Sequence, residues 1–277
     1  MSDVLRSEMF QGLFKAHRRR LSISTVVLLI PATLFWGYLT IATPAFASTC
    51  GSQSPAQIGY AGYTSLPSSW SQTPEGVSAY IMARNGPVCS NLSYPYTWST
   101  AWVMLQDDGV SNHYAQAGYM YDNTSGCMRL YNEYNIGAGF TRHLGACVTQ
   151  GVKVTANVYY TGAAGPYPPG GHGLSMQTSQ PTPIALSNYM PYDPWTLGWS
   201  FQPTFFGETD HSGPNDIPGS VYAKADISAM GIYRVSDGAQ VPIPCYLSKY
   251  SSNLPSPNRY FANASGCDHI RVWTNPF

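Results

Sequence analysis

The sequence predicts an all-β protein: an antiparallel β-sandwich of the jelly-roll or concanavalin-like type, preceded by an N-terminal hydrophobic export helix. Only 10% of the residues are charged and 14% are aromatic, and the chain has 21 Tyr, 26 Gly and 22 Pro. Between residues 50 and 277 the apolar residues show no helical period and occur in short runs separated by turn formers. This composition is typical of a β-rich extracellular domain and does not fit a helical cytosolic enzyme or a disordered chain.

The first 49 residues differ in kind and are predicted to be a signal peptide or signal anchor. A basic block that ends in Arg18-Arg19-Arg20 is followed by an apolar, uncharged segment, residues 21–47. Ala45-Phe46-Ala47 matches the small-residue pattern of a signal-peptidase site, so we expect cleavage after Ala47 and secretion of one β-sandwich domain, residues 50–277. The apolar segment is also long enough to cross a bilayer. A cell-surface protein anchored in the membrane by this segment alone is therefore the alternative.

All six cysteines lie in the exported part, which predicts three disulfides. Pairing of nearest neighbours gives Cys50–Cys89, Cys127–Cys147 and Cys245–Cys267, with other pairings open. No Cys-x-x-Cys motif occurs and the His residues are scattered, so neither a metal site nor a cofactor is expected. The net charge is zero and no basic cluster follows the N-terminal block, so nucleic acid is not an expected partner.

Alternating or β-branched and aromatic runs, bounded by Gly, Pro, Asn and Ser, predict the strands. We expect strands at residues 76–84, 99–106, 113–120, 128–134, 148–160, 174–178, 199–210, 221–227, 230–235 and 270–273. Residues 52–73 are predicted to be an extended, loosely structured entry, and residues 161–173 a loop or flap. Pro203 predicts that its strand lies at an edge or contains a bulge.

Residues 99–134 are predicted to form the central antiparallel meander, and two polar side chains stand out in it. Gln116 and Glu133 each lie among apolar residues, and alternation places Glu133 on one face with Arg129 and Tyr131. An unpaired carboxylate is costly to bury, so an ion pair with Arg129 is the simplest structural interpretation of Glu133. The corresponding interpretation of Gln116 is a buried amide bonded to neighbouring backbone.

The exported part contains two further glutamates. Glu208 lies in an aromatic-rich strand, and its simplest structural interpretation is a strand-end acid before the loop that begins at Thr209. Glu75 lies in a polar entry beside Pro74, where a solvated side chain is expected. Glu133 and Glu208 are therefore the carboxyl groups with a candidate functional role.

Several of these segments resemble the eqolisin glutamic peptidases and the related neprosin group. Trp102-Val-Met-Leu, Ala115-Gln-Ala-Gly-Tyr119 and Leu130-Tyr-Asn-Glu-Tyr134 are similar in order and spacing to the Trp-Val-Gly-Ile, Gln-Thr-Gly and Trp-Tyr-Glu-Trp strands of eqolisins. Val148–Val154 resembles the strand that follows, and Trp199–Glu208 resembles the segment with the catalytic Glu. The resemblance covers residues 99–235 and implies the same sandwich fold.

The resemblance also implies a site and a polypeptide substrate. Glu208 would take a proton from water that attacks a peptide carbonyl and then protonate the leaving amine. Gln116 would hold the water and donate its amide hydrogen to the developing oxyanion. Glu133, Trp102 and Tyr131 would support this pair, and an acidic pH optimum is implied.

Two other classes of function fit the same residues. In a carbohydrate-binding or carbohydrate-active sandwich, Tyr and Trp rings stack on a polysaccharide, and Glu133 and Glu208 serve as the two carboxyl groups of a glycosidase. In a non-catalytic surface module, Gln116 and Glu208 lie far apart or are sealed in the core. A glycosidase places the two carboxyl groups opposite each other in one cleft, whereas a peptidase places Glu208 opposite Gln116.

Overall fold

The computed structural model describes residues 58–64, 74–89, 97–107, 112–161, 173–181, 185–190, 201–210, 215–234, 240–242, 248–251 and 259–275. The predicted export segment, residues 1–49, and the predicted cleavage after Ala47 lie outside this part of the chain. Within the described residues, no helix is long and apolar enough to cross a membrane.

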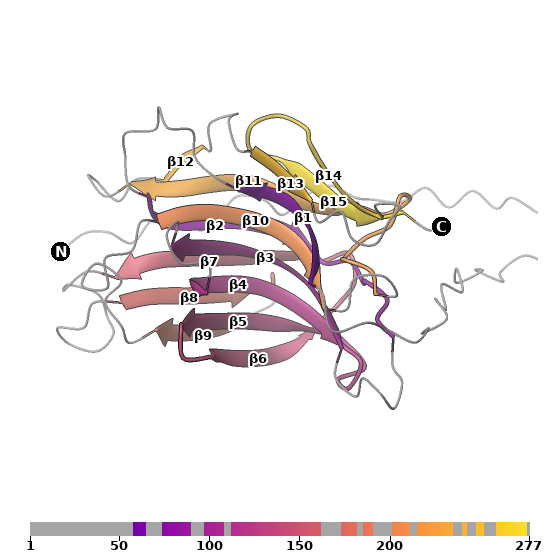
Figure 1. Ribbon diagram of the computed structural model, residues 1–277, viewed down its shortest axis with the longest axis horizontal. Coiled ribbons are helices and arrows are strands. Elements are labelled where there is room, and N and C mark those ends of the chain that lie inside the picture. Colours follow the sequence, from indigo (N-terminus) through magenta and orange to yellow (C-terminus); the bar gives the residue numbers. More distant parts are fainter. Residues whose placement is uncertain are drawn as a thin grey trace, which may run out of the picture. The chain divides into compact units, whose positions relative to one another are not determined.

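The described residues form β-strands joined by turns and irregular segments (Figure 1). The strands are β1 Gly59–Thr64, β2 Pro74–Met82, β3 Trp98–Asp107, β4 His113–Asp122, β5 Met128–Ile136, β6 Phe140–Val148, β7 Lys153–Thr161, β8 Gly173–Ser179, β9 Ala185–Met190, β10 Phe201–Thr209, β11 Ala225–Arg234, β12 Gln240–Pro242, β13 Ser248–Ser251, β14 Tyr260–Ala264 and β15 Ile270–Thr274. The prediction of an all-β chain is confirmed for this part.

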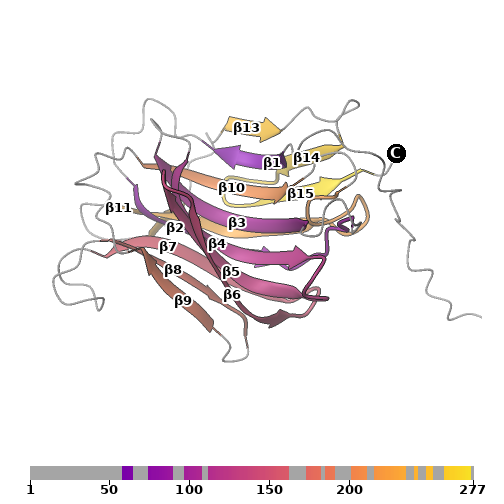
Figure 2. The same cartoon turned by 60° about the horizontal axis from the view of Figure 1, so that its bottom comes forward.

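The strands form two antiparallel sheets that lie face to face (Figures 1 and 2). One sheet has the order β13-β1-β10-β3-β4-β5-β6. The other has the order β14-β15-β11-β2-β7-β8-β9, and β12 pairs with β11 beside it. The predicted meander of residues 99–134 is confirmed as β3, β4 and β5, which are consecutive neighbours in the first sheet.

The core lies between the sheets because the central strands of both sheets direct alternate, apolar residues inward. Val103 and Leu105 of β3 are fully buried, and so are Val77, Ile81 and Val158 of the opposite sheet, within one continuous cluster. The intervening residues of β3 point to the outer face of the seven-stranded sheet. On that outer face a separate cluster of large side chains is buried: Trp102, Met104, Met120, Tyr131 and Phe206.

Several strands differ from the sequence-based expectation. β1 forms within the stretch expected to be loosely structured, while β6, β9, β12, β13 and β14 were not predicted. The single strand expected at residues 148–160 is divided: Val148 ends β6, a turn follows, and β7 begins at Lys153. Gly151 takes a φ of 84° in that turn, a conformation that glycine adopts without strain. The two strands expected at 221–227 and 230–235 are one strand, β11, with a register shift near Ala229.

Pro203 does not mark an edge strand. β10 lies inside the sheet, between β1 and β3, so the edge prediction is wrong for the strand as a whole. The described pairing of β10 with β1 stops at Thr204, while Pro203 pairs with Leu105 of β3. The proline, which has no N–H to donate, thus lies where the neighbouring strand has ended.

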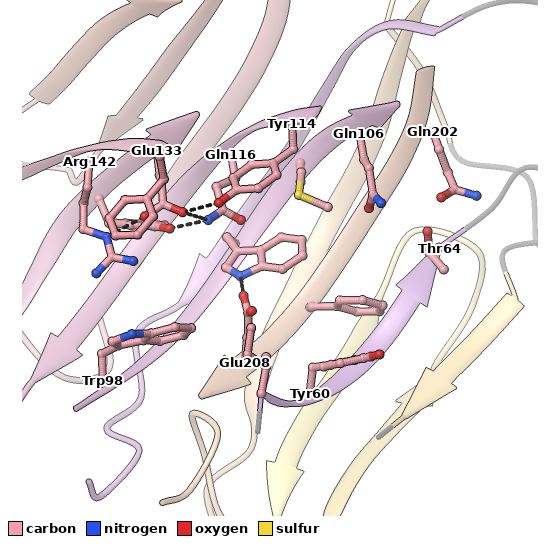
Figure 3. Close-up of a pocket in the computed structure, with 16 residues that line it drawn as sticks. Tyr60, Thr64, Trp98, Gln106, Tyr114, Gln116, Glu133, Arg142, Gln202 and Glu208 are labelled. Atoms are coloured by element: carbon pink, nitrogen blue, oxygen red, sulfur yellow. Dashed lines mark hydrogen bonds and ion pairs between the residues drawn. The ribbon is translucent and has the colours of Figure 1, made fainter. Parts of the chain in front are cut away.

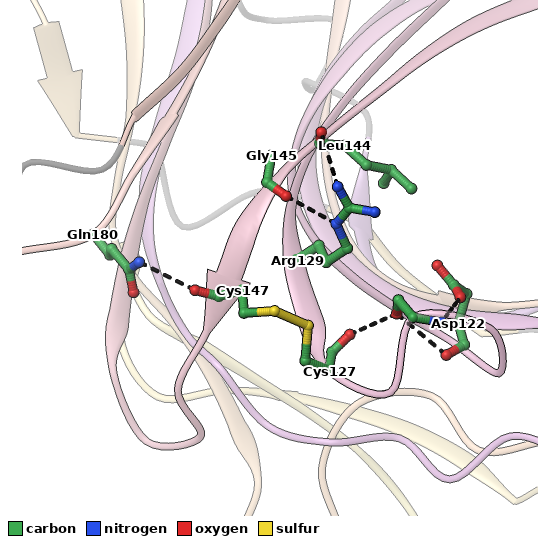
Figure 4. Close-up of a disulfide and its surroundings, with 8 residues drawn as sticks. Asp122, Cys127, Arg129, Leu144, Gly145, Cys147 and Gln180 are labelled. Carbon is green, nitrogen blue, oxygen red and sulfur yellow. Dashed lines mark hydrogen bonds between the residues drawn. A yellow bond between two sulfur atoms is a disulfide. The ribbon is translucent and has the colours of Figure 1, made fainter.

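The Cys127–Cys147 disulfide is present as predicted and joins the start of β5 to the end of β6 (Figure 4). Cys89 and Cys267 are also disulfide-bonded, and their predicted partners, Cys50 and Cys245, lie outside the described residues. The disulfide therefore fixes the hairpin of β5 and β6, which is the part of the sheet that carries several of the site residues described next.

Candidate functional site

A cavity of about 630 Å³ lies on the outer face of the seven-stranded sheet (Figure 3). Its aromatic lining residues are Tyr60, Trp98, Trp102, Tyr114, Tyr131, Phe140 and Phe206. Its polar lining residues are Thr64, Gln106, Gln116, Glu133, Arg142, Gln202 and Glu208. Two exposed apolar side chains, Ile58 and Phe140, also line it, so the cavity opens to solvent. All five site residues predicted from the sequence therefore lie in one cavity.

Trp102 lies between Gln116 and Glu208 in the sheet. It pairs with Gly118 of β4, two residues from Gln116, and with Phe206 of β10, two residues from Glu208. Residues two apart on a strand share a face, so the three side chains lie on a diagonal across β4, β3 and β10. The sheet register thus brings together two residues that are far apart in the sequence.

Gly118 allows β3 and β4 to approach at this point. A Cβ atom on Gly118 would overlap the Ala101 carbonyl oxygen and would lie 2.8 Å from the Cα of Trp102. The obstruction is backbone, which cannot move without separating the strands. A glycine is therefore required beside Trp102 for the two strands to pair as they do.

Glu133 is held by three donors. It accepts hydrogen bonds from the Tyr114 hydroxyl at Oε1 over 2.6 Å, from Gln116 Nε2 at Oε1 over 3.1 Å, and from Arg142 Nε at Oε2 over 2.5 Å. The partner of its charge is Arg142 of β6, so the predicted ion pair with Arg129 is wrong. Arg129 instead donates to backbone carbonyls of β6 (Figure 4). Both oxygens of Glu133 are thus occupied, which offsets the cost of its burial.

Gln116 is oriented by this carboxylate. Its Nε2 atom donates to Glu133 Oε1 and to the Tyr131 hydroxyl. Because a carboxylate oxygen only accepts hydrogen bonds, Glu133 selects the amide nitrogen and turns the carbonyl oxygen of Gln116 away from itself (Figure 3). Gln116 is buried, as the structural interpretation expected, but its partners are side chains of the cavity wall rather than backbone.

Glu208 accepts a hydrogen bond of 2.6 Å from Trp102 Nε1 and is half-buried at the cavity (Figure 3). Desolvation by burial raises the pKa of Glu208 to about 7. The hydrogen bond from Trp102 and the charge of Arg142 oppose this rise in pKa, whereas the negative charges of Glu133 and Asp210 add to it. Its partial exposure lets water reach a carboxyl group that changes protonation near neutral pH.

Asp210 helps to hold the strands that carry the site in place. Asp210 lies two residues beyond Glu208, and its negative charge raises the pKa of Glu208. The Asp210 carboxylate accepts hydrogen bonds from the backbone N–H of Trp98 over 2.8 Å and from Asn215 Nδ2 over 3.0 Å. These bonds fix the end of β10 against the start of β3.

Glu75 lies elsewhere. It is half-buried and lines a smaller cavity of about 250 Å³ with Tyr159, Tyr160 and Tyr233, which belong to the other sheet. Desolvation raises the pKa of Glu75, so it is less solvated than the sequence suggested. Among the residues that the structure describes, no group of three or more His, Cys, Asp or Glu side chains could hold a metal ion.

The cavity contains functional candidates that the sequence analysis did not select. Arg142 was missed because β6 was not predicted, and a strand that is exposed along much of its length gives a weak pattern. Alternation did contain a signal for others: residues two and four positions beyond Trp102 are Met104 and Gln106, and both line the cavity. The same step backward from Glu208 reaches Phe206, which also lines it.

The fold of the described strands is similar to that of solved β-sandwich structures of a glutamic peptidase. Two crystal structures of scytalido-glutamic peptidase match the chain over 79% of its length. The first, with a peptide-based transition state analog, has a TM-score of 0.55, 11% identity and 98% of its own chain covered. The second, with a transition state analog inhibitor, has a TM-score of 0.54, 12% identity and 99% covered.

No protein-family model and no curated protein sequence matches the chain. The resemblance to eqolisins that the sequence motifs indicate is thus confirmed by similarity of structure. At this level of sequence identity the similarity establishes a shared fold.

Proposed function

We propose that this protein is a peptidase that cleaves internal peptide bonds, with Glu208 and Gln116 acting on a water molecule in the cavity. The observation that carries the proposal is the diagonal of Gln116, Trp102 and Glu208 across three strands of the outer sheet face. It places a carboxyl group with a raised pKa and an oriented amide around one water-accessible space. The shared fold with a glutamic peptidase supports the same function.

The proposed chemistry follows from the hydrogen bonds. Ionised Glu208 takes a proton from water as the water oxygen attacks the peptide carbonyl carbon, and it then gives that proton to the leaving amine nitrogen. The carbonyl oxygen of Gln116 accepts a hydrogen bond from the attacking water. The amide nitrogen of Gln116 has two hydrogens. In the free protein one is donated to the Tyr131 hydroxyl, and this hydrogen turns to the oxyanion during the reaction. The other stays bonded to Glu133. Trp102 holds Glu208 in position throughout.

The pKa of Glu208 bears on the pH optimum. The resemblance implies an acidic optimum, but a general base with a pKa of about 7 is mostly protonated below that pH. We therefore expect kcat/KM to rise with pH, and the midpoint of this rise to lie near the pKa of Glu208. The proposed optimum is close to neutral.

The state of Glu133 favours a polypeptide substrate over a polysaccharide. Hydrolysis of a glycosidic bond needs two carboxyl groups that can exchange protons or attack the sugar. Both oxygens of Glu133 are engaged by Arg142, Tyr114 and Gln116. This leaves Glu208 as the only carboxyl group among the described lining residues whose oxygens are not all engaged.

The proposal is tested by incubating the exported domain with a denatured protein between about pH 3 and about pH 8, a range that brackets ordinary and raised carboxyl pKa values. We expect E208Q to lower kcat/KM by at least about 100-fold, the contribution of a positioned general base. We expect Q116A to lower it by about 100-fold, as for the loss of an oxyanion donor.

The matched control is E75Q, which makes the same carboxyl-to-amide change at the separate cavity on the other sheet. It should retain the wild-type rate. Equal activity of the wild type, E208Q and Q116A would eliminate the proposed mechanism. Release of sugars from a polysaccharide, without cleavage of protein, would assign the cavity to the carbohydrate class instead.

We also propose that the domain is exported through its N-terminal segment. Disulfides at Cys127, Cys147, Cys89 and Cys267 support an oxidising compartment. Sequencing the N-terminus of the protein recovered from the culture medium tests this. A start immediately after Ala47 agrees with cleavage, and a full-length chain found only in the membrane fraction agrees with the anchor.

A further inference from the structure

The cavity has two chemically different ends (Figure 3). Arg142, Glu133 and Trp98 lie at one end, where charge is compensated within the protein. Gln106, Gln202 and Thr64 lie at the other, and no lining residue named there is charged. Gln116 and Glu208 lie between the two ends. A chain molecule bound along the cavity would therefore pass over Gln116 and Glu208 and reach both ends.

The uncharged end is built from a cross-strand pair. Gln106 of β3 and Gln202 of β10 are register partners, and both are half-buried cavity-lining residues. The next pair on the same face includes Thr204, whose hydroxyl lies 2.9 Å from that of Thr64. Two primary amides thus stand side by side on rigid neighbouring strands, within an otherwise aromatic cavity.

Amides placed in this way match the main chain of a polypeptide. A primary amide carries both N–H donors and a carbonyl acceptor, which are the kinds of group that complement a peptide group. Such contacts do not depend on the charge of the substrate side chains. Substrate side chains would instead meet the rings of Phe206 and Tyr60, which stack with centroids 5.5 Å apart.

The strand register gives the distance between the pair of Gln side chains and the proposed reacting groups. Gln106 is four residues from Trp102 along β3, which corresponds to about 13 Å of strand. An extended peptide advances by about 3.3 Å per residue. The Gln pair therefore lies about four residues from a peptide bond positioned over Trp102.

We infer that Gln106 and Gln202 form a subsite that binds the main chain of an extended polypeptide about four residues from the cleaved bond, on one side of it. This inference rests on the proposed peptidase function and adds the length and direction of substrate that the cavity takes. Peptides that end before the subsite lose its hydrogen bonds, whereas longer peptides gain them on one side only.

The experiment measures the benefit of peptide length. A cleaved bond is first located by mass spectrometry of a digested denatured protein, and peptides around it are made with two or six residues on either side. For the wild type we expect lengthening on one side to raise kcat/KM by about tenfold, the effect of two neutral hydrogen bonds. For Q106A/Q202A we expect that gain to shrink to less than about twofold.

The control is Q177A, whose amide donates to the Tyr159 hydroxyl on the other sheet and lies outside the cavity. It should keep the full gain. A double variant that lowers the rates of short and long peptides equally would overturn the subsite and leave the peptidase intact. So would a wild type that gains nothing from length on either side.

Binding of a short and a long extended peptide to E208Q, which requires no known cleavage site, is followed by tryptophan fluorescence and gives the length ratio without turnover. A ratio of affinities that Q106A/Q202A abolishes in the E208Q background supports the subsite even if the wild type cleaves neither peptide, in which case the proposed catalytic function fails alone. Binding of a linear oligosaccharide in place of both peptides would overturn the assignment to polypeptide.

Discussion

Trp102 Nε1 donates a 2.6 Å hydrogen bond to Glu208 Oε2, so an early strand of the meander fixes the direction of a carboxyl group about 100 residues later in the chain. The bond lowers the pKa of Glu208 and partly offsets the effect of burial. Both the orientation of Glu208 and the pH at which it ionises therefore depend on an indole N–H from a neighbouring strand.

The first prediction concerns this donor. W102F keeps an aromatic ring in the cavity wall but removes the N–H, so the pKa of Glu208 should rise further. We expect the ascending limb of the kcat/KM profile to move to higher pH and the maximal rate to fall about tenfold or more. The profile is measured with one peptide substrate over the full pH range.

The matched control for that change is W273F, because Trp273 Nε1 donates to Asn275 Oδ1 over 2.9 Å on the other sheet. It removes an indole donor without touching the cavity. If W102F and W273F share the wild-type midpoint, the bond from Trp102 does not set the ionisation of Glu208.

The second prediction concerns Arg142, which is the charge partner of Glu133. R142Q leaves a buried carboxylate without its cation, and we expect a loss of about 3 kcal/mol in the free energy of unfolding. Without the bond from Arg142 the Glu133 carboxylate is held less firmly, so the Gln116 amide should lose its fixed orientation and the catalytic rate should fall. R142K keeps the charge and should restore part of both. Urea denaturation and steady-state kinetics measure the two effects.

An exposed ion pair provides the comparison for Arg142. Arg271 Nε lies 2.8 Å from Asp226 Oδ1, but its side chain is 44% exposed. R271Q should change the free energy of unfolding by less than about 1 kcal/mol. A loss as large as that of R142Q would show that burial is not what makes the Arg142 pair important.

The third prediction is a pH dependence of stability. The pKa of Glu208 is about 7 in the folded protein, against an ordinary value of 4.5. Between these two pH values the folded state binds more protons than the unfolded state, so the free energy of unfolding falls as pH rises. E208Q removes this dependence, because an amide stays neutral. We expect E208Q to gain on the order of 1–3 kcal/mol relative to the wild type between about pH 4 and about pH 8.

Thermal denaturation of the wild type and E208Q at both pH values tests this linkage. The comparison at acidic pH is the internal control, because Glu208 is then mostly protonated in both the folded and the unfolded states. A difference in Tm that is the same at both pH values would mean that the folded protein does not raise the pKa of Glu208.

The fourth prediction concerns the disulfide between Cys127 and Cys147. It closes a loop with a sequence separation of 20 residues, and its loss in C127A/C147A should cost about 3 kcal/mol of unfolding free energy. The disulfide joins the two strands that carry Glu133 and Arg142, so the rate should fall as well. A reductant should weaken the wild type more than the variant. If the wild type and C127A/C147A have the same free energy of unfolding, the hairpin of β5 and β6 is stabilised by strand pairing and not by the disulfide.

Much of the fold could be predicted from local patterns. Alternation and turn residues located β2, β3, β4, β5 and β10, and the short spacing of Cys127 and Cys147 suggested their bond. β6 escaped prediction because an edge strand that is half-exposed carries no clear apolar alternation. β1 escaped because its short Gly- and Tyr-containing run resembles a loop.

The candidate site could be predicted only as separate residues. Alternation assigns Gln116, Glu133 and Trp102 to faces of their own strands, but it does not say which strand lies beside which. The partner of Glu133 proved to be Arg142 rather than Arg129, because the register between β5 and β6 places Arg142 directly opposite. An ion pair within one strand was the only choice that local pattern could suggest.

The sequence by itself determined the class of structure, the identity of the meander and the few polar residues that an aromatic sheet face had to accommodate. These follow from short-range chemistry: the two-residue period of a strand, the geometry of turns and the cost of burying charge. Only the tertiary structure decided that β10 lies between β1 and β3, which brings Glu208 to Trp102 and Gln116. The pairing of distant strands depends on how the whole core packs, and no local stretch of sequence contains that information.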